Sequence, residues 1–163
     1  MLCRNHSCLV NNDMSIDLRE IETRFRQHAV RLTRQRAAIY AALVETTSHP
    51  SADDLYRMVT RQQPMMSRNT VYYTLGVLRN AGLIREVNVG HDMARYDGNV
   101  SMHHHLICLG CGQILDVMDD ELNQLHLSSG QARGFEVQGH RVEFHGYCVS
   151  CQQVERNVSP RRS

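Results

Sequence analysis

The sequence from Ser67 to Asp97 reads "SRNTVYYTLGVLRNAGLIREVNVGHDMARYD" and indicates the fold of the N-terminal half of the chain. Its first half predicts a helix, because Ser67 is a favourable N-cap, apolar residues then recur with helical spacing, and Gly82 is a typical stop. Its second half predicts two short strands around a turn at Gly90, because apolar and polar residues alternate there. Helices followed by such a hairpin are typical of a winged helix-turn-helix domain.

Three further helices are predicted upstream. The first starts at Asp17 and places Leu18 on its apolar face. Thr33 caps the second, "TRQRAAIYAALVE", and Ser51 forms a capping box with Asp54 at the start of the third, "SADDLYRMV". In a helix-turn-helix unit, the N-terminal residues of the last helix reach the DNA bases, although an ordinary helical domain with a polar face fits the same pattern. The candidate DNA-binding residues are Arg68, Asn69, Thr70, Tyr72 and Tyr73.

The second half of the chain predicts a small α/β domain. Strand-like segments read "HLIC", "QILDV", "FEVQG" and "RVEFHGYC", and a helical stretch, "DDELNQLHLSSGQA", lies between the second and the third. The fold class is therefore α+β. The predicted organisation is a flexible N-terminal tail (1–14), a winged-helix DNA-binding domain (15–97), a linker (98–104), a small α/β domain (105–152) and a C-terminal tail (153–163).

Composition narrows the class of protein. The 163 residues are 42% hydrophobic, which is enough for packed cores. No apolar run approaches the roughly 18 residues that span a bilayer, and the first residues lack the apolar region of a signal peptide, so we expect a cytoplasmic protein without a membrane partner. In that compartment, six cysteines are expected to be metal ligands or redox groups rather than disulfides.

Charge adds weak support for a nucleic-acid partner. Residues 1–97 hold 13 Arg against 10 Asp and Glu, a balance of +3, whereas residues 98–163 hold 5 against 7, a balance of −2. Every basic residue is Arg, whose planar fork suits phosphates and guanine edges. A solvated surface of mixed charge gives the same counts.

Two Cys-x-x-Cys pairs carry the strongest chemical signal. Cys108 with Cys111 and Cys148 with Cys151 supply four thiolates, the ligand set of a tetrahedral structural Zn(II). A redox dithiol is the alternative, but it needs only one pair, placed at a helix start, and "LICLGCGQILDV" reads as strand, knuckle, strand. Cys3 and Cys8 lie in the N-terminal tail and are interpreted as unpaired thiols, with metal binding as the alternative.

Three histidines precede the first pair. The run is internal, so a purification tag does not explain it. In a strand, His103 and His105 point to one face and His104 to the other. Such a two-histidine edge predicts a second metal site completed by "SHPSADD", "ARYDG" or "ILDVMDD", whereas solvated histidines remain the simpler alternative. A zinc hydrolase or deaminase is disfavoured, because neither H-x-E nor H-E-x-x-H occurs.

The order of several separated motifs resembles the ferric uptake regulator family of metal-dependent repressors, over roughly residues 17–152. These motifs are "LTRQRAAIYAAL", "SHPSADDLY", "SRNTVYYTLGVLRNAGLI", "RYD", "HHHLICLGCG" and "HGYCVSC". The resemblance implies a winged-helix domain that binds double-stranded operator DNA. It also implies that residues 98–104 are a hinge and that residues 105–152 are a dimerisation and metal-binding domain that forms a homodimer. It implies structural zinc on Cys108, Cys111, Cys148 and Cys151, and a regulatory Fe(II) or Mn(II) site on His49, Asp97, His103, His105 and Asp116.

Within that family, the sequence looks more like the peroxide-sensing branch. The branch that senses iron usually has glutamates where this chain has Asp97 and Asp116. Met102 and Asn123 replace a His and a Glu that are common at an auxiliary metal site. The resemblance implies a non-enzymatic repressor in which iron-catalysed oxidation of His49 or His103 signals peroxide. An iron-responsive repressor without peroxide sensing is the alternative, and a zinc-stabilised thiol oxidoreductase is the remaining enzyme reading.

Overall fold

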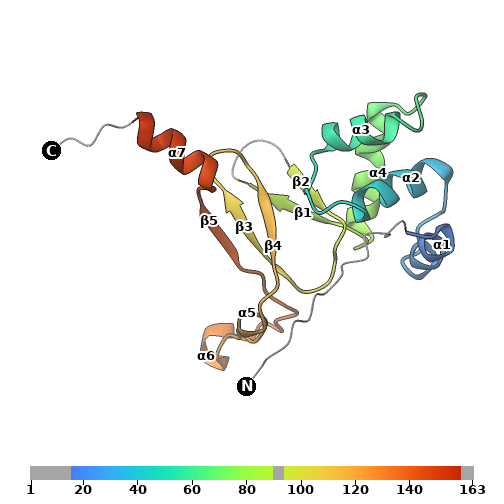
Figure 1. Ribbon diagram of the computed structural model, residues 1–163. Helices are drawn as coiled ribbons and strands as arrows, with labels where there is room; N and C mark the ends of the chain where they lie inside the picture. Colours follow the sequence, from blue (N-terminus) through green and yellow to red (C-terminus); the bar gives the residue numbers. More distant parts are fainter. Residues whose placement is uncertain (1–15, 90–93, 159–163) are drawn as a thin grey trace, which may run out of the picture.

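The computed structural model describes residues 16–89 and 94–158, so the predicted N-terminal tail and the Gly90 turn lie outside the described residues. Four helices come first, and a two-stranded antiparallel sheet follows them (Figure 1). Within this part of the chain, no helix has the length and apolar character needed to cross a bilayer. The bounds of these elements are α1 Leu18–Gln27, α2 Arg34–Val44, α3 Ala52–Thr60, α4 Arg68–Asn80, β1 Arg85–Asn88 and β2 Ala94–Asp97.

A mixed three-stranded sheet forms the second half, on the side of β1 and β2 away from the helices (Figure 1). Strand β3 is central: it pairs antiparallel with β4 and parallel with β5. Short helices lie between β4 and β5, and a longer helix follows β5. The bounds are β3 His104–Cys108, β4 Ile114–Val117, α5 Asp120–Asn123, α6 Ser129–Ala132, β5 Glu143–Gly146 and α7 Val149–Val158.

The predicted helix caps are confirmed. The side chains of Thr33, Ser51 and Ser67 accept hydrogen bonds from the first turns of α2, α3 and α4, and Asp54 completes the capping box with Ser51. Gly82 follows α4 with a φ of 72°, a conformation that glycine adopts without steric cost. The core of this half is the buried apolar faces of the four helices, centred on Tyr40 and residues such as Phe25, Leu43, Leu55 and Leu78.

Four expectations need correction. "FEVQG" (135–139) is not a strand: Phe135 and Val137 are exposed, and no described strand lies beside this segment to pair with it. The stretch from 119 to 132 forms two single-turn helices, because residues 124–128 leave the helical path. Leu18 is exposed rather than packed. Helix α7 continues to Val158, into the region predicted as a C-terminal tail.

The segment after β2 packs tightly against the helices. A Cβ atom on Gly98 would lie 2.8 Å from the Cα of Val44, so only glycine fits there without displacing the backbone. The amide of Tyr96 donates to the carbonyl of Pro50 at 3.0 Å, and Ser51 forms a bridge with Arg95. These contacts hold the end of β2 beside the loop between α2 and α3.

Candidate metal centres

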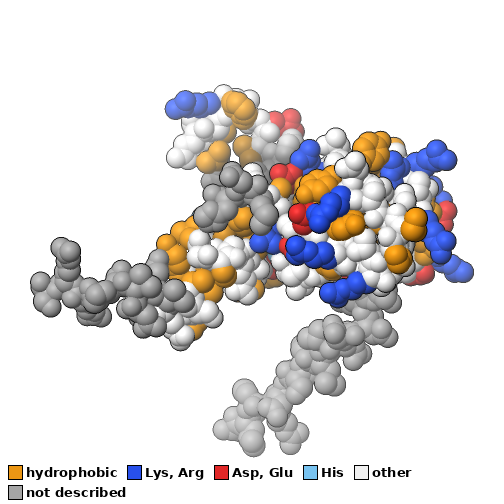
Figure 2. All heavy atoms as spheres, turned by 90° about the horizontal axis from the view of Figure 1, so that it is seen from above, with side chains coloured by type: hydrophobic (Ala, Val, Ile, Leu, Met, Phe, Trp, Pro, Cys, Tyr) orange, Lys and Arg blue, Asp and Glu red, His pale blue; other side chains and the backbone are white. Residues whose placement is uncertain are grey.

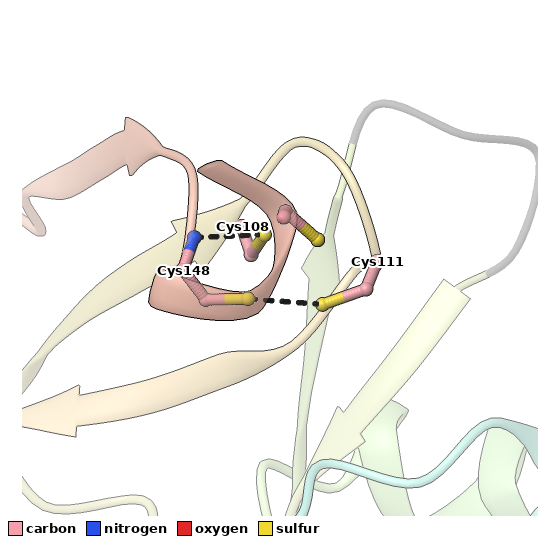
Figure 3. Close-up of side chains that lie close together, drawn as sticks. Cys108, Cys111 and Cys148 are labelled. Carbon is pink, nitrogen blue, oxygen red and sulfur yellow. Dashed lines mark hydrogen bonds between the residues drawn. The ribbon is translucent and has the colours of Figure 1, made fainter. Parts of the chain in front are cut away.

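Four cysteine sulfurs converge where the turn after β3 meets the start of α7. The ligand atoms of Cys108, Cys111, Cys148 and Cys151 all lie within 4.8 Å of one another, and Figure 3 shows the first three around the knuckle. The sulfurs of Cys111 and Cys148 are 3.8 Å apart. Sulfurs held about 2.3 Å from zinc at the corners of a tetrahedron lie about 3.8 Å apart. The cluster therefore fits a tetrahedral zinc ion.

Backbone amides form hydrogen bonds with a cysteine sulfur of this cluster and favour its thiolate form, which binds a cation. The Cys148 amide donates to the Cys108 sulfur at 3.2 Å (Figure 3), and with the amides of Cys111 and Gly110 it lowers the pKa of the Cys108 thiol to about 6. Hydrogen bonds with the sulfurs of Cys148 and Cys108 raise the pKa of Cys151 to about 12. Without a cation, the Cys108 thiolate is thus stabilised by protonated neighbouring cysteines. A bound cation would favour deprotonation of all four thiols.

The cluster also requires a glycine at position 110, in the spacer of the first cysteine pair, and the cysteine pattern does not predict this. A Cβ atom there would lie 2.8 Å from the Cys151 sulfur and 3.0 Å from its Cβ. Gly112, after the pair, has a φ of 70°. A side chain at Gly110 would clash with Cys151 at the start of α7, and a side chain at Gly112 would strain the backbone. Both positions of the turn therefore favour glycine.

The second cluster draws on both halves of the chain. His49 lies in the loop before α3 and Asp97 ends β2, whereas His103, His105 and Asp116 come from the segment before β3, from β3 and from β4. The ligand atoms of His49, Asp97, His103 and His105 lie within 4.8 Å of one another, and all four side chains are buried. Asp116 adds a fifth group, since its Oδ1 is 3.1, 3.7 and 3.8 Å from the Nε2 atoms of the three histidines.

The dimensions of this His/Asp cluster fit a small divalent cation. His103 Nε2 lies 3.0 Å from both Asp97 Oδ2 and His105 Nε2. Ligands about 2.1 Å from an octahedral ion lie about 3.0 Å apart along an edge. Among the described residues, Asp97 Oδ2, Asp116 Oδ1 and His49 Nε2 are buried without a hydrogen-bond partner. Buried polar atoms are rarely left unpaired, so these atoms are arranged for a ligand.

Backbone carbonyls orient two of the imidazoles. His49 Nδ1 lies 3.1 Å from the Thr47 carbonyl, and His103 Nδ1 lies 3.0 Å from the Ser101 carbonyl. An Nδ1–H that donates to each carbonyl leaves Nε2 without a proton and directed at the cluster, an arrangement typical of metal-binding histidines. Sequence reasoning missed Thr47 and Ser101, because a carbonyl contribution leaves no signature in residue type.

Electrostatics favour the ligand forms of His49 and Asp97. Burial lowers the pKa of His49, against the smaller opposing effects of Asp97 and Asp116, so the imidazole is neutral at pH 7. Burial alone would raise the pKa of Asp97, but the nearby His105 imidazole, the hydrogen bond that the Asn99 amide donates to Asp97 Oδ1, and the neighbouring His103 and His49 lower it overall. A neutral imidazole and an ionised carboxylate are the forms that bind divalent metals.

The backbone at His49 is held in an uncommon conformation. Its φ is 48°, in the left-handed region that side chains other than glycine rarely adopt. Such a conformation costs on the order of 1 kcal/mol and is often found at functional sites. Pro50 follows directly and its carbonyl is bonded to β2, so the strain accompanies the placement of the imidazole in the cluster.

His104 points to the opposite face, as the strand alternation predicts. Its Nδ1 accepts from the Val142 amide at 3.1 Å, and its ring stacks on His140 with centroids 5.8 Å apart. His140 Nε2 is 2.7 Å from the Leu122 carbonyl. Among the described residues, no group of three or more His, Cys, Asp or Glu with ligand spacing includes either ring.

The candidate DNA-binding residues line the start of α4. Arg68, Asn69, Tyr72 and Tyr73 are exposed, and the Arg68 guanidinium lies 4.7 Å from the centre of the Tyr56 ring while forming an ion pair with an α3 carboxylate. Thr70 is different: it is half-buried, and its amide donates to the Ser67 side chain, so it completes the helix cap. Figure 2 shows Arg side chains spread over the helical half and hydrophobic side chains over the C-terminal half.

Comparisons with known proteins agree with this architecture. Residues 27–145 match the model of the ferric uptake regulator family. The chain is 37% identical to the peroxide operon regulator of Bacillus subtilis over 141 residues, which are 86% of this chain and 97% of that protein. It is 34% identical to the peroxide-responsive repressor PerR of Staphylococcus aureus over 146 residues, 85% of this chain and 99% of that one.

The fold also matches a solved structure. The ferric uptake regulator Fur of Helicobacter pylori aligns with a TM-score of 0.67 at 20% identity, covering 83% of this chain and 91% of that one. The family model spans most of the chain, and the full-length relatives share more than 30% identity with it. This chain therefore belongs to the ferric uptake regulator family.

Proposed function

We propose that this protein is a metal-dependent DNA-binding repressor that senses hydrogen peroxide in the bacterial cytoplasm. The observation that carries the proposal is the His/Asp cluster, which joins His49 and Asp97 of the helical half to His103, His105 and Asp116 of the other half. The two relatives described above are a peroxide operon regulator and a peroxide-responsive repressor, which supports a regulatory role.

Metal binding at the cluster would favour one arrangement of the two halves. An ion held by residues from both halves binds best where all five groups converge, so it shifts the population toward that arrangement by its difference in affinity. Couplings of this kind are usually about 1 to 3 kcal/mol. Imidazole and carboxylate ligands suit Fe(II) or Mn(II), whereas four thiolates suit a structural Zn(II) on Cys108, Cys111, Cys148 and Cys151.

The start of α4 is proposed to read the operator. Arg68, Asn69, Tyr72 and Tyr73 offer a guanidinium, an amide and two phenols from consecutive exposed turns, the groups that contact phosphates and base edges in a major groove. In a homodimer, the angle between the halves sets the spacing of two such helices, and hence whether both reach successive turns of the groove.

The exposed face of the C-terminal sheet supports a homodimer. Leu106 pairs with Leu115 on β4 and with Phe144 on β5, so these three side chains form a row across the sheet. They are 44%, 50% and 43% exposed, and Figure 2 shows hydrophobic surface over this half. A contiguous apolar face on a small domain is typical of an interface, and a second copy of the chain presents the matching surface.

Peroxide sensing would arise from iron at the cluster. Fe(II) held by the five cluster residues would supply reducing electrons to hydrogen peroxide, and the net reaction would transfer one peroxide oxygen to an adjacent imidazole and release the other as water. His49 and His103 are the proposed targets, because each presents Nε2 to the cluster while its Nδ1 side is fixed by a carbonyl. An imidazole that gains an oxygen atom binds metal poorly, so the two halves would separate and the operator would be released.

Operator binding measured against added Mn(II) tests the metal-dependent part of this function. Wild-type protein with intact zinc should bind operator DNA of a ferric uptake regulator family repressor only with Mn(II). His49→Ala should lose this Mn(II)-dependent binding while keeping its zinc. Metal-independent binding by the wild-type protein would contradict the proposal.

A further inference from the structure

A cavity of about 560 Å³ opens beside the His/Asp cluster. His49, Asp97 and Asp116 line it, and so do Glu20 and Arg24 of α1. Asp116 is 22% exposed, whereas the other four cluster side chains are at most 4% exposed. The buried cluster thus communicates with solvent on its Asp116 side, through a cavity that helix α1 helps to enclose.

Two opposite charges stand at this cavity. Arg24 Nη2 donates to Glu20 Oε1 at 2.5 Å, and the pair is about half exposed. Arg24 Nη1 also donates to the hydroxyl of Tyr40 at 3.0 Å, and Tyr40 is a buried core residue. The guanidinium is therefore anchored at the cavity wall. Among the described residues, neither Glu20 nor Arg24 has an ion pair with any member of the cluster.

We propose that divalent cations reach the cluster through this cavity, and that the Glu20–Arg24 pair sets the rate of loading. This inference rests on the regulatory metal site proposed above. Glu20 attracts an incoming cation, as do the cluster carboxylates deeper in the cavity, and Arg24 repels it. Charges around a cleft change association rates by about tenfold or more at low salt, and the effect falls steeply as salt screens them.

Opposite substitutions make the test specific. Glu20→Gln leaves Arg24 as an unpaired cation at the cavity, so association of the metal should slow several-fold. Arg24→Gln leaves Glu20 unpaired, so association should become several-fold faster. Both differences should shrink as ionic strength increases from about 0.01 M to about 1 M, where the screening length falls from about 30 Å to about 3 Å.

The measurement is stopped-flow binding of Co(II), followed by its visible absorption, to full-length protein that retains its zinc. Arg79→Gln and Glu86→Gln are the matched controls, because they split another exposed ion pair, which does not line the cavity. The controls should keep the wild-type rate. Thermal unfolding of each variant verifies that the fold is retained.

The outcomes separate two claims. If wild-type protein binds Co(II) at the cluster but Glu20→Gln and Arg24→Gln associate at the wild-type rate, or change it in the same direction, the loading route is wrong and the metal site stands. If wild-type protein binds no Co(II) that His49→Ala removes, the regulatory metal site itself is wrong.

Discussion

His49 Nε2 lies 3.1 Å from Asp116 Oδ1, although His49 precedes α3 in the helical half and Asp116 lies in β4 of the other half. In the described part of the chain, every ion pair of His49 and of Asp116 is with another member of the His/Asp cluster. The two side chains therefore meet where the two halves pack around the site. Metal binding at the proposed site would be linked to the relative position of the halves through this pair.

The length of the carboxylate at position 116 should tune the peroxide response. Asp116→Glu keeps an ionisable ligand, so operator binding should remain dependent on Mn(II). The longer side chain displaces its oxygen relative to the three imidazoles, so histidine oxidation in the Fe(II)-loaded protein should slow several-fold. Gel shifts and peptide mass spectrometry measure the two effects. A variant that responds to peroxide as fast as the wild type would show that the length of the carboxylate at position 116 does not affect peroxide sensing.

Zinc retention should depend on Gly110 as strongly as on the cysteines. Gly110→Ala introduces a Cβ atom 2.8 Å from the Cys151 sulfur, so the four thiolates can no longer converge. We expect loss of the single zinc per chain and unfolding or monomerisation of the C-terminal half, as for Cys111→Ser. Gly139→Ala is the control, because a Cβ atom there meets nothing within 4 Å. Zinc content is measured after dialysis, and the oligomeric state is measured by sedimentation. Retained zinc and an unchanged dimer in both Gly110→Ala and Cys111→Ser would reject the zinc site.

The linker after β2 should tolerate no side chain at Gly98. A Cβ atom at Gly98 meets the α2 backbone at 2.8 Å, so Gly98→Ala should destabilise the protein by about 1 to 3 kcal/mol. It should also weaken Mn(II) binding, because Asp97 moves with its neighbour. Gly76→Ala, inside α4 with open space around it, should instead stabilise by up to about 1 kcal/mol. Denaturant unfolding compares the two, and equal stability of both variants would show that the close contact is relieved at no cost.

The N-terminal turns of α4 should govern operator affinity. Arg68→Ala and Tyr72→Ala should each weaken binding by about 1 to 3 kcal/mol where the side chain contacts a base. Arg79→Ala, at the far end of the same helix and exposed to a similar degree as Arg68, should have little effect. Fluorescence anisotropy with metal-saturated protein measures the affinities. Wild-type affinity in both Arg68→Ala and Tyr72→Ala would exclude this helix end as the reader.

Local sequence signals predicted most of the helical half. The caps at Thr33, Ser51 and Ser67 depend on contacts three residues away, so residue order alone reveals them. The segments between β4 and β5 in the C-terminal half were harder to predict. Residues 135–139 alternate like a strand, but no described strand pairs with them: the sheet consists of β4, β3 and β5, and Phe135 and Val137 are exposed.

The candidate sites show the same division. Paired cysteines predicted one cluster directly. For the other cluster, strand alternation indicated only His103 and His105, and the family resemblance was needed to select His49, Asp97 and Asp116, since the five residues lie up to 67 positions apart, from 49 to 116. The clash at Gly110 and the carbonyls that orient His49 and His103 depend on tertiary contacts. No pattern of residue types records such contacts.

Mass spectrometry of the zinc-containing protein after exposure to low hydrogen peroxide determines whether iron at the His/Asp cluster leads to oxidation of its histidines, with Fe(II)-loaded and Mn(II)-loaded samples compared. The Fe(II) form should gain one oxygen atom on His49 or His103 and lose operator binding, with the four cysteines unmodified, and the Mn(II) form should do neither. Oxidation confined to the cysteines would identify a thiol switch and contradict the account; an Fe(II) form that binds the operator yet gains no oxygen would identify an iron-responsive repressor instead.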